Sequence, residues 1–203
     1  MHRLTSAASE ARKVATEAIK LVPPSQGAEV EATLALAMAG DVARAEPLVQ
    51  KLTERFPMDT QVQSLWLPTI QAQLMLDRKN AAKAIERLQA ATSIELGEIM
   101  FVLNTSCLWP AYVRGEAYLG VGRGSAAVEF QRILDHSGVV WNCSTGALAR
   151  LGLARAYALD ARTDAVARDK ARTAYQNFLT LWKDADPDIP IYQQAKAEYA
   201  KLQ

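Results

Sequence analysis

The segment from residue 109 to 134, WPAYVRGEAYLGVGRGSAAVEFQRIL, constrains the fold more than any other part of this chain. Large apolar residues recur at helical spacing on both sides of a glycine-rich turn, which predicts two amphipathic helices that fold back on each other. Gly115 and Ala127 are small residues at which we expect these two helices to touch. Tyr118 follows Gly115 by three residues, so it lies on the same helical face and fills the space beside the contact.

The composition favours helices throughout. Of the 203 residues, 50% are apolar and 22% are charged, as in an ordinary globular protein. The strong helix formers Ala, Leu, Glu, Lys, Arg and Gln are abundant, and alternating runs of Val, Ile and Thr are absent. We therefore predict an all-α fold. The formal charge is only +1 and basic residues alternate with acidic ones, so no nucleic-acid partner is expected.

Helix breakers divide the chain into units. An N-terminal helix over 9–22, capped by Ser9, is expected to end at Pro23 and Pro24. Asp41 follows a glycine and is placed to cap a helix. Pro47 should kink that helix. Pro68 predicts a bend of the chain near Trp66. The expected helix-hairpin units span 27–57, 59–96, 109–136 and 145–186, and a capping helix over 190–202 places Lys196, Glu198 and Lys201 on its solvent side.

The spacing of small and aromatic residues resembles the tetratricopeptide repeat, a helix–turn–helix unit of about 34 residues. Gly115, Tyr118 and Ala127 match its signature best. The other units are poorer copies, whose matching residues are Gly40, Asp41, Ala45, Pro57, Ala84, Ala154, Tyr157, Ala171, Tyr175 and Phe178. The resemblance implies one domain over 1–203, a right-handed α-solenoid of antiparallel helix pairs with a C-terminal capping helix.

Longer stretches, such as VQSLWLPTIQAQL and GALARLGLARAYAL, are similar to the C-terminal repeat region of bacterial serine/threonine protein kinases of acidobacterial type. That similarity implies a regulatory or sensory repeat domain of a larger signalling protein. It brings no kinase activity, because the chain has no HRD or DFG motif and no glycine-rich loop after a strand. We expect a scaffold that is not an enzyme and needs no cofactor or metal.

In the repeat family, peptides or helices bind a concave groove lined by the first helix of each pair. The resemblance places eight candidate residues in that groove. The aromatic ones are interface anchors if they are exposed and packing residues if they are buried. The candidates are Trp66, Thr69, Gln73, Trp109, Tyr112, Glu116, Leu151 and Arg155.

Two other interpretations are open. The apolar connector over 94–108, with Met100, Phe101, Val102 and Leu103, and the unpaired first helix favour a spacer or self-association module. The second interpretation is a nucleophile or metal site formed by Asp135, His136 and Cys143, with Cys107 as a fourth member. This second set is disfavoured because closely paired zinc ligands are missing. We expect the two cysteines to be small, partly buried residues and not a disulfide, although pairing is open.

No secretory leader is expected at the N-terminus, and no apolar run is long enough to span a bilayer. The expected location is therefore cytoplasmic by default. It is extracytoplasmic if a membrane helix precedes this segment in the parent protein.

Overall fold

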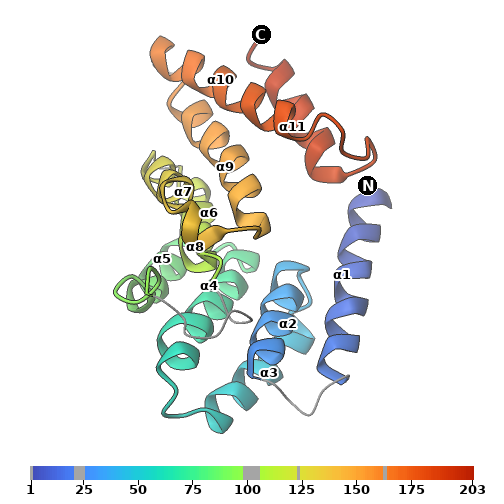
Figure 1. Ribbon diagram of the computed structural model, residues 1–203, viewed down its shortest axis with the longest axis vertical. Helices are drawn as coiled ribbons and strands as arrows, with labels where there is room; N and C mark the ends of the chain where they lie inside the picture. Colours follow the sequence, from blue (N-terminus) through green and yellow to red (C-terminus); the bar gives the residue numbers. More distant parts are fainter. Residues whose placement is uncertain (1, 21–25, 98–105, 123, 162–163) are drawn as a thin grey trace. The chain divides into compact units, whose positions relative to one another are not determined.

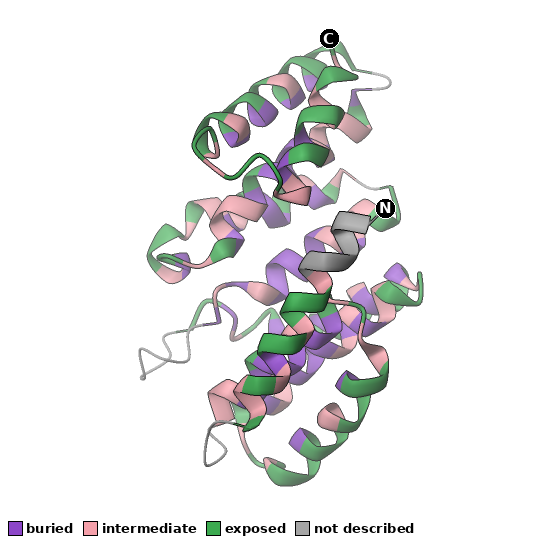
Figure 2. Cartoon of the chain, turned by 90° about the vertical axis from the view of Figure 1, so that its right-hand side faces the viewer, coloured by how far each residue is buried: buried purple, intermediate pink, exposed green. Residues whose placement is uncertain are grey.

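The computed structural model describes residues 2–20, 26–97, 106–122, 124–161 and 164–203. Every regular element in these residues is a helix, which confirms the all-α prediction (Figure 1). The chain packs as two compact units, Met1–Ser106 and Cys107–Gln203. In each unit the buried residues lie on the helix faces that meet one another, and the exposed residues lie on the opposite faces (Figure 2).

In the first unit, each new hairpin packs onto the one before it. Helix α2 contacts α1 and α3, and α4 contacts both α2 and α3 before it pairs with α5. The elements of this unit are α1 (His2–Lys20), α2 (Gln26–Met38), α3 (Val42–Arg55), the π-helix η1 (Val62–Trp66), α4 (Leu67–Asp77), α5 (Ala81–Leu88) and the 3₁₀-helix η2 (Gln89–Ala91).

A polar side chain begins α3 where the sequence predicts it. The Asp41 carboxylate accepts from the backbone N–H of Arg44 at 3.3 Å and caps α3. Gly40 precedes it with φ +70°, a conformation that a side chain would strain. The predicted start of the first helix is wrong, because α1 already begins at His2 and Ser9 lies inside it. Pro23 and Pro24 lie outside the described residues.

Near Trp66, where Pro68 predicts a bend, the chain forms the π-helix η1. Pro68 has no N–H, so it cannot donate to the carbonyl of Ser64 four residues earlier. The chain widens just before it, and the N–H of Leu67 donates to the carbonyl of Val62, five residues back. Pro47, in contrast, lies within α3, which continues past it to Arg55.

The second unit repeats the packing order of the first. Helix α9 contacts both α6 and α7, then pairs with α10, and α11 covers the end of the unit. The elements are α6 (Trp109–Gly120), α7 (Ser125–Asp135), α8 (Ser137–Val140), α9 (Ser144–Asp160), α10 (Ala165–Leu181) and α11 (Pro190–Ala200).

One phenylalanine joins the three central helices of this unit. The ring of Phe130, on α7, is fully buried. A Cβ added at Gly115 of α6 would lie 2.7 Å from its Cε1 and Cζ, and one added at Gly152 of α9 would lie 2.5 Å from the same atoms. The sequence predicted a close contact at Gly115, but the neighbour is this ring. Ala127 instead lies partly exposed in a surface pocket beside Tyr157.

Candidate functional site

Helix α6 carries a stripe of two aromatic residues and one carboxylate. Trp109, Tyr112 and Glu116 are three and four residues apart, so they lie on one face of the helix. The rings of Trp109 and Tyr112 meet edge to face with centroids 5.6 Å apart. Tyr112 is buried, whereas Trp109 and Glu116 are partly exposed. The stripe therefore has an aromatic end and an acidic end, both of which solvent reaches in part.

Arg155 of α9 pairs with Glu198 of α11 through two hydrogen bonds. Its Nε donates to Oε2 at 2.9 Å and its Nη2 donates to Oε1 at 3.0 Å. The hydroxyl of Tyr175 donates to the same Oε2 at 3.0 Å. This is the bidentate geometry in which a guanidinium binds a carboxylate most strongly. Arg155 is thereby oriented and its charge is balanced.

The structure places Glu198 differently from the sequence expectation. We expected it on the solvent side of the last helix, but it faces α9 and is only 32% exposed. It follows the fully buried Ala195 by three residues, so both lie on the inner face of α11. That spacing is the sequence signal that could have identified Glu198. Its partner Arg155, which lies 43 residues away, gives no local signal.

Glu116 is the one carboxylate of this group without a hydrogen-bond partner among the described residues. Its Oε1 is buried and accepts no hydrogen bond. Burial raises the pKa of the Glu116 carboxyl; the positive charge of Arg155 opposes that rise, and the negative charge of Glu198 adds to it. Burial also raises the pKa of the neighbouring Tyr112 hydroxyl. Glu198 accepts hydrogen bonds from Arg155 and Tyr175, which offset the cost of burying its charge, whereas Oε1 of Glu116 accepts none.

We call the partly exposed residues Trp109, Glu116, Arg155 and Glu198 the α6–α9–α11 face. They come from three helices that are not consecutive in the chain. Leu151, which was also a candidate, is buried in the core with Tyr175 and Phe178 and is not part of the face.

The three candidates of the first unit are mostly buried. Trp66 is 1% exposed, and its Nε1 has no acceptor among the described residues. Thr69 is fully buried and donates to the carbonyl of Leu65 at 2.6 Å. Gln73 is partly exposed and donates to the Asp77 carboxylate at 3.2 Å. Of the three, only Gln73 has surface that a partner could contact.

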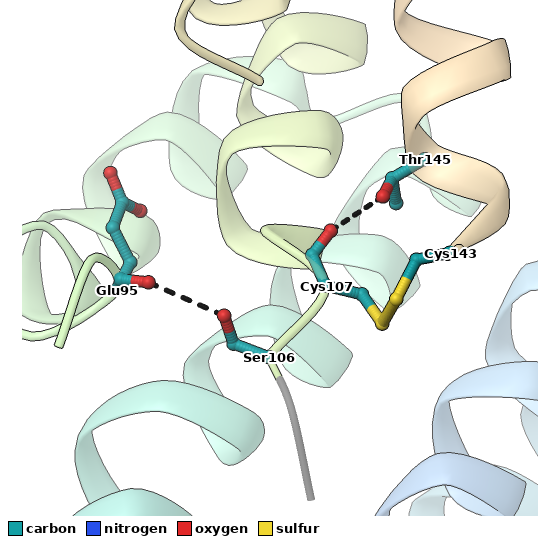
Figure 3. The surroundings of a disulfide bond; sticks show 5 residues. All are labelled: Glu95, Ser106, Cys107, Cys143 and Thr145. Carbon is teal, nitrogen blue, oxygen red and sulfur yellow. Dashed lines mark hydrogen bonds between the residues drawn. A yellow bond between two sulfur atoms is a disulfide. The ribbon is translucent and has the colours of Figure 1, made fainter. Parts of the chain in front are cut away.

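Cys107 and Cys143 form a disulfide, so our expectation that they stay unpaired is wrong (Figure 3). The bond joins the residues preceding α6 and α9. Thr145 reinforces the link, because its hydroxyl donates to the carbonyl of Cys107 at 2.6 Å. Cys107 and Leu108 both have positive φ values, 49° and 52°. On the other side of the division between units, the Ser106 hydroxyl donates to the carbonyl of Glu95.

The nucleophile hypothesis at residues 135–143 does not survive this pairing. The Cys143 sulfur is bonded to Cys107 and cannot act as a thiolate. The Nδ1 of His136 bonds the carbonyl of Arg132, and Asp135 accepts from Gln131, so both side chains are engaged with their own helix. Within the described residues, no cluster of His, Cys, Asp and Glu is placed to hold a metal ion.

None of the described helices combines the length and the apolar character that a membrane span requires. The apolar connector residues Met100 to Leu103 lie outside the described part of the chain. Comparison of the chain with known protein families, with curated proteins and with solved structures finds no match.

Proposed function

We propose that this chain is a protein-interaction domain of tetratricopeptide-like helix pairs, and that its α6–α9–α11 face binds a peptide or helix. The packing order supports the repeat assignment: α4 contacts both helices of the preceding pair in the first unit, and α9 does so in the second. In a stack of this kind, the first helices of successive pairs share one face, which serves for binding.

The observation that carries this proposal is the convergence of partly exposed, chemically mixed side chains from α6, α9 and α11. Trp109 offers the type of large aromatic surface that anchors protein interfaces. The guanidinium of Arg155 and the carboxylates of Glu116 and Glu198 offer orienting charges, held by a buried layer beneath them. Protein interfaces commonly combine buried aromatic residues with a polar rim.

The test is selection from a phage-displayed library of random linear peptides against the purified full chain. Peptides that use this face lose about tenfold or more in affinity when Trp109→Ala or Arg155→Ala is introduced, because truncating an interface anchor costs more than 1 kcal/mol. Arg150→Ala is the matched control, since Arg150 is exposed on the same helix and outside the face. Circular dichroism confirms that each variant is folded. Binders that ignore both face substitutions, or no binders, would reject the proposal.

The biological setting follows from the resemblance to kinase-associated repeats. We propose a regulatory segment of a larger bacterial signalling protein. Disulfides persist in oxidising compartments, so the Cys107–Cys143 bond favours an extracytoplasmic position over the cytoplasmic default. Mass spectrometry of the protein from its native cell, with free thiols alkylated before lysis, tests this. An alkylated Cys107 would place the domain in a reducing compartment.

The alternative, a spacer or self-association module, makes an opposite prediction. Such a module selects no peptide at the α6–α9–α11 face, and a self-associating one gains mass with concentration in light scattering. A monomer at high concentration that selects face-dependent peptides would exclude self-association as its main role.

A further inference from the structure

The first unit carries an open groove between two of its helices. Helix α4 lies between α3 and α5 and contacts both of them (Figure 1). Side chains from all three helices line one cavity of about 690 Å³, a volume within the usual range of ligand-binding clefts. We call this cavity the α3–α4–α5 groove. Its lining belongs to the first unit alone, so it is separate from the α6–α9–α11 face.

Two helical stripes form most of the groove. On α3 the lining side chains recur at intervals of about one turn from Glu46 to Glu54, and on α4 they do so from Gln71 to Arg78. Eight residues of α-helix rise about 12 Å, which is slightly more than two turns. The groove is therefore long enough to hold about two turns of another helix.

The two stripes run in opposite directions. Arg78, directly after the last residue of α4, forms an ion pair with Glu46 in the first half of α3. Gln63, just ahead of α4, donates to the carbonyl of Phe56, just beyond α3, at 2.9 Å. The last residues of the α3 stripe and the first residues of the α4 stripe therefore lie at the same end of the groove.

The middle of the groove is apolar. Val49 of α3 and Met75 of α4 both line it and are partly exposed, and Leu74 lies buried beside them. Methionine is flexible and polarisable, so it adapts to the shape of an apolar group placed against it. This part of the groove can therefore take up an apolar side chain of a ligand.

One end of the groove has two charges that are not neutralised by each other. Glu54 of α3 accepts from Nε2 of Gln50 at 2.9 Å, and Nε of Arg87, on α5, donates to Oε1 of Gln71 at 2.5 Å. Both partners are neutral amides, and neither charge belongs to an ion pair among the described residues. A ligand at this end therefore meets a negative group on the α3 side and a positive group on the α5 side.

We propose that the α3–α4–α5 groove binds an amphipathic helix of a partner protein. An apolar residue of that helix packs on Met75, and at the charged end a basic residue lies toward Glu54 and an acidic residue toward Arg87. A helix satisfies its own backbone hydrogen bonds and presents apolar anchors at helical spacing. An extended peptide needs backbone partners, but the amides of Gln50 and Gln71 are already engaged and the groove helices bond their own backbones.

Selection of helical peptides gives the first test. The probe is a phage-displayed library of helix-forming peptides of about 15 residues, near the length at which an isolated helix becomes stable, selected on the immobilised full chain. Groove-bound peptides should lose about fivefold or more in affinity on Met75→Ala, because truncating an interface anchor has an effect of this size. Met38→Ala, at an exposed methionine outside the groove, is the matched control. Circular dichroism checks the fold of both variants.

The result separates the groove from the α6–α9–α11 face. Peptides that depend on Met75 and ignore Arg155→Ala would support the groove whether or not the proposed function holds. Peptides that depend on Arg155 and ignore Met75→Ala would refute the groove and leave the proposed function standing. Selection of no Met75-dependent peptide would also refute the groove.

Charge reversal tests the orientation of the bound helix. Glu54→Lys and Arg87→Glu change exposed side chains, and Glu86→Lys and Lys83→Glu are the matched controls at exposed positions of α5 outside the lining. Each groove reversal should weaken a selected peptide about threefold or more, because an exposed attraction is replaced by repulsion. Reversing the facing charge of the peptide should restore the affinity. Losses without such rescue would show that these charges do not face the ligand.

Two measurements exclude other occupants. A proline at the centre of a selected peptide should weaken binding about a hundredfold, because it breaks a helix; a peptide that tolerates it binds in an extended form, which would overturn the proposed helix. Light scattering of the chain alone tests a second copy as occupant. A dimer that Met75→Ala converts to a monomer would assign the groove to self-association and overturn the proposal.

Discussion

Adding one methyl group at Gly152 tests whether Phe130 fixes the spacing of three helices. In Gly152→Ala the new Cβ would lie 2.5 Å from Cε1 and Cζ of the Phe130 ring. Carbon atoms in contact prefer about 3.5–4.0 Å, so either the ring or α9 must move by about 1 Å. The ring has little freedom, because the same two atoms face Gly115, where an added Cβ would be 2.7 Å away, and Tyr112 packs edge to face on the ring.

The magnitude follows from two opposing terms. Overpacking of a filled core costs about 1–3 kcal/mol. Replacing a helical glycine by alanine favours the helix by about 1 kcal/mol. The net effect of the two terms is that Gly152→Ala lowers the free energy of unfolding by up to about 2 kcal/mol. Gly138→Ala is the control, since Gly138 lies in α8 with no atom within 4 Å of an added Cβ, and it should be neutral or stabilising.

The assay is urea denaturation of the full chain, followed by circular dichroism, with hydrogen exchange to locate the loss in α6, α7 and α9. Phe130→Leu removes the clashing atoms, so Gly152→Ala should cost at least about 1 kcal/mol less in that background than in wild type. Contacting residues commonly show coupling of this size, and independent ones add within about 0.5 kcal/mol. Additive effects, or equal effects of Gly152→Ala and Gly138→Ala, would refute the argument.

Three further predictions concern the disulfide and the carboxylates of Glu129 and Glu116. Cys107 and Cys143 are 36 residues apart, so reducing the bond between them should lower the free energy of unfolding by about 4 kcal/mol through loop entropy. Dithiothreitol should lower the thermal midpoint of wild type but not that of a variant with both cysteines replaced by serine. An unchanged midpoint of wild type would contradict this. The Glu129 carboxylate lies 2.7 Å from the Arg114 guanidinium, and Arg114→Met leaves it buried without this charge partner. The substitution should lower the free energy of unfolding in urea by about 3–5 kcal/mol. Adding Glu129→Leu should restore most of that loss, and a double variant as unstable as the single one would show that the charge pair is not the cause. The raised pKa of Glu116 means that its protonated form stabilises the fold fully below the usual value of 4.5, and that this contribution is lost as pH rises through the raised pKa. Between pH 4.5 and the raised pKa of Glu116, the stability of Glu116→Gln relative to wild type should therefore increase by up to about 1.4 kcal/mol per pH unit. A pH-independent difference between their urea midpoints would show that Glu116 is not the titrating group.

Signals between near neighbours in the chain determined the helices. The cap at Asp41 and the turn after Gly120 each depend on residues within about one helical turn, so the sequence predicted them. The same local information was too weak at the N-terminus, where α1 begins at His2 and not at Ser9. Ser9 can cap a helix, but it is also tolerated inside one when the helix extends further.

The candidate site depended on contacts that local patterns do not encode. The repeat resemblance grouped Tyr112, Glu116 and Arg155 as groove candidates, and in the structure the charge of Arg155 acts on the pKa of Glu116. It did not show that Trp66 is buried, because an amphipathic stripe has the same spacing whether a neighbouring helix or solvent covers it.

The sequence by itself determined the all-α class, because hydrogen bonding within an α-helix joins residues only four apart. Only the tertiary structure decided the pairings between distant residues. The bond between Cys107 and Cys143 and the ion pair of Arg155 with Glu198 join residues 36 and 43 positions apart. Such pairs form where the packing of α6, α9 and α11 brings them together, and that packing is set by the shapes of buried side chains such as Phe130.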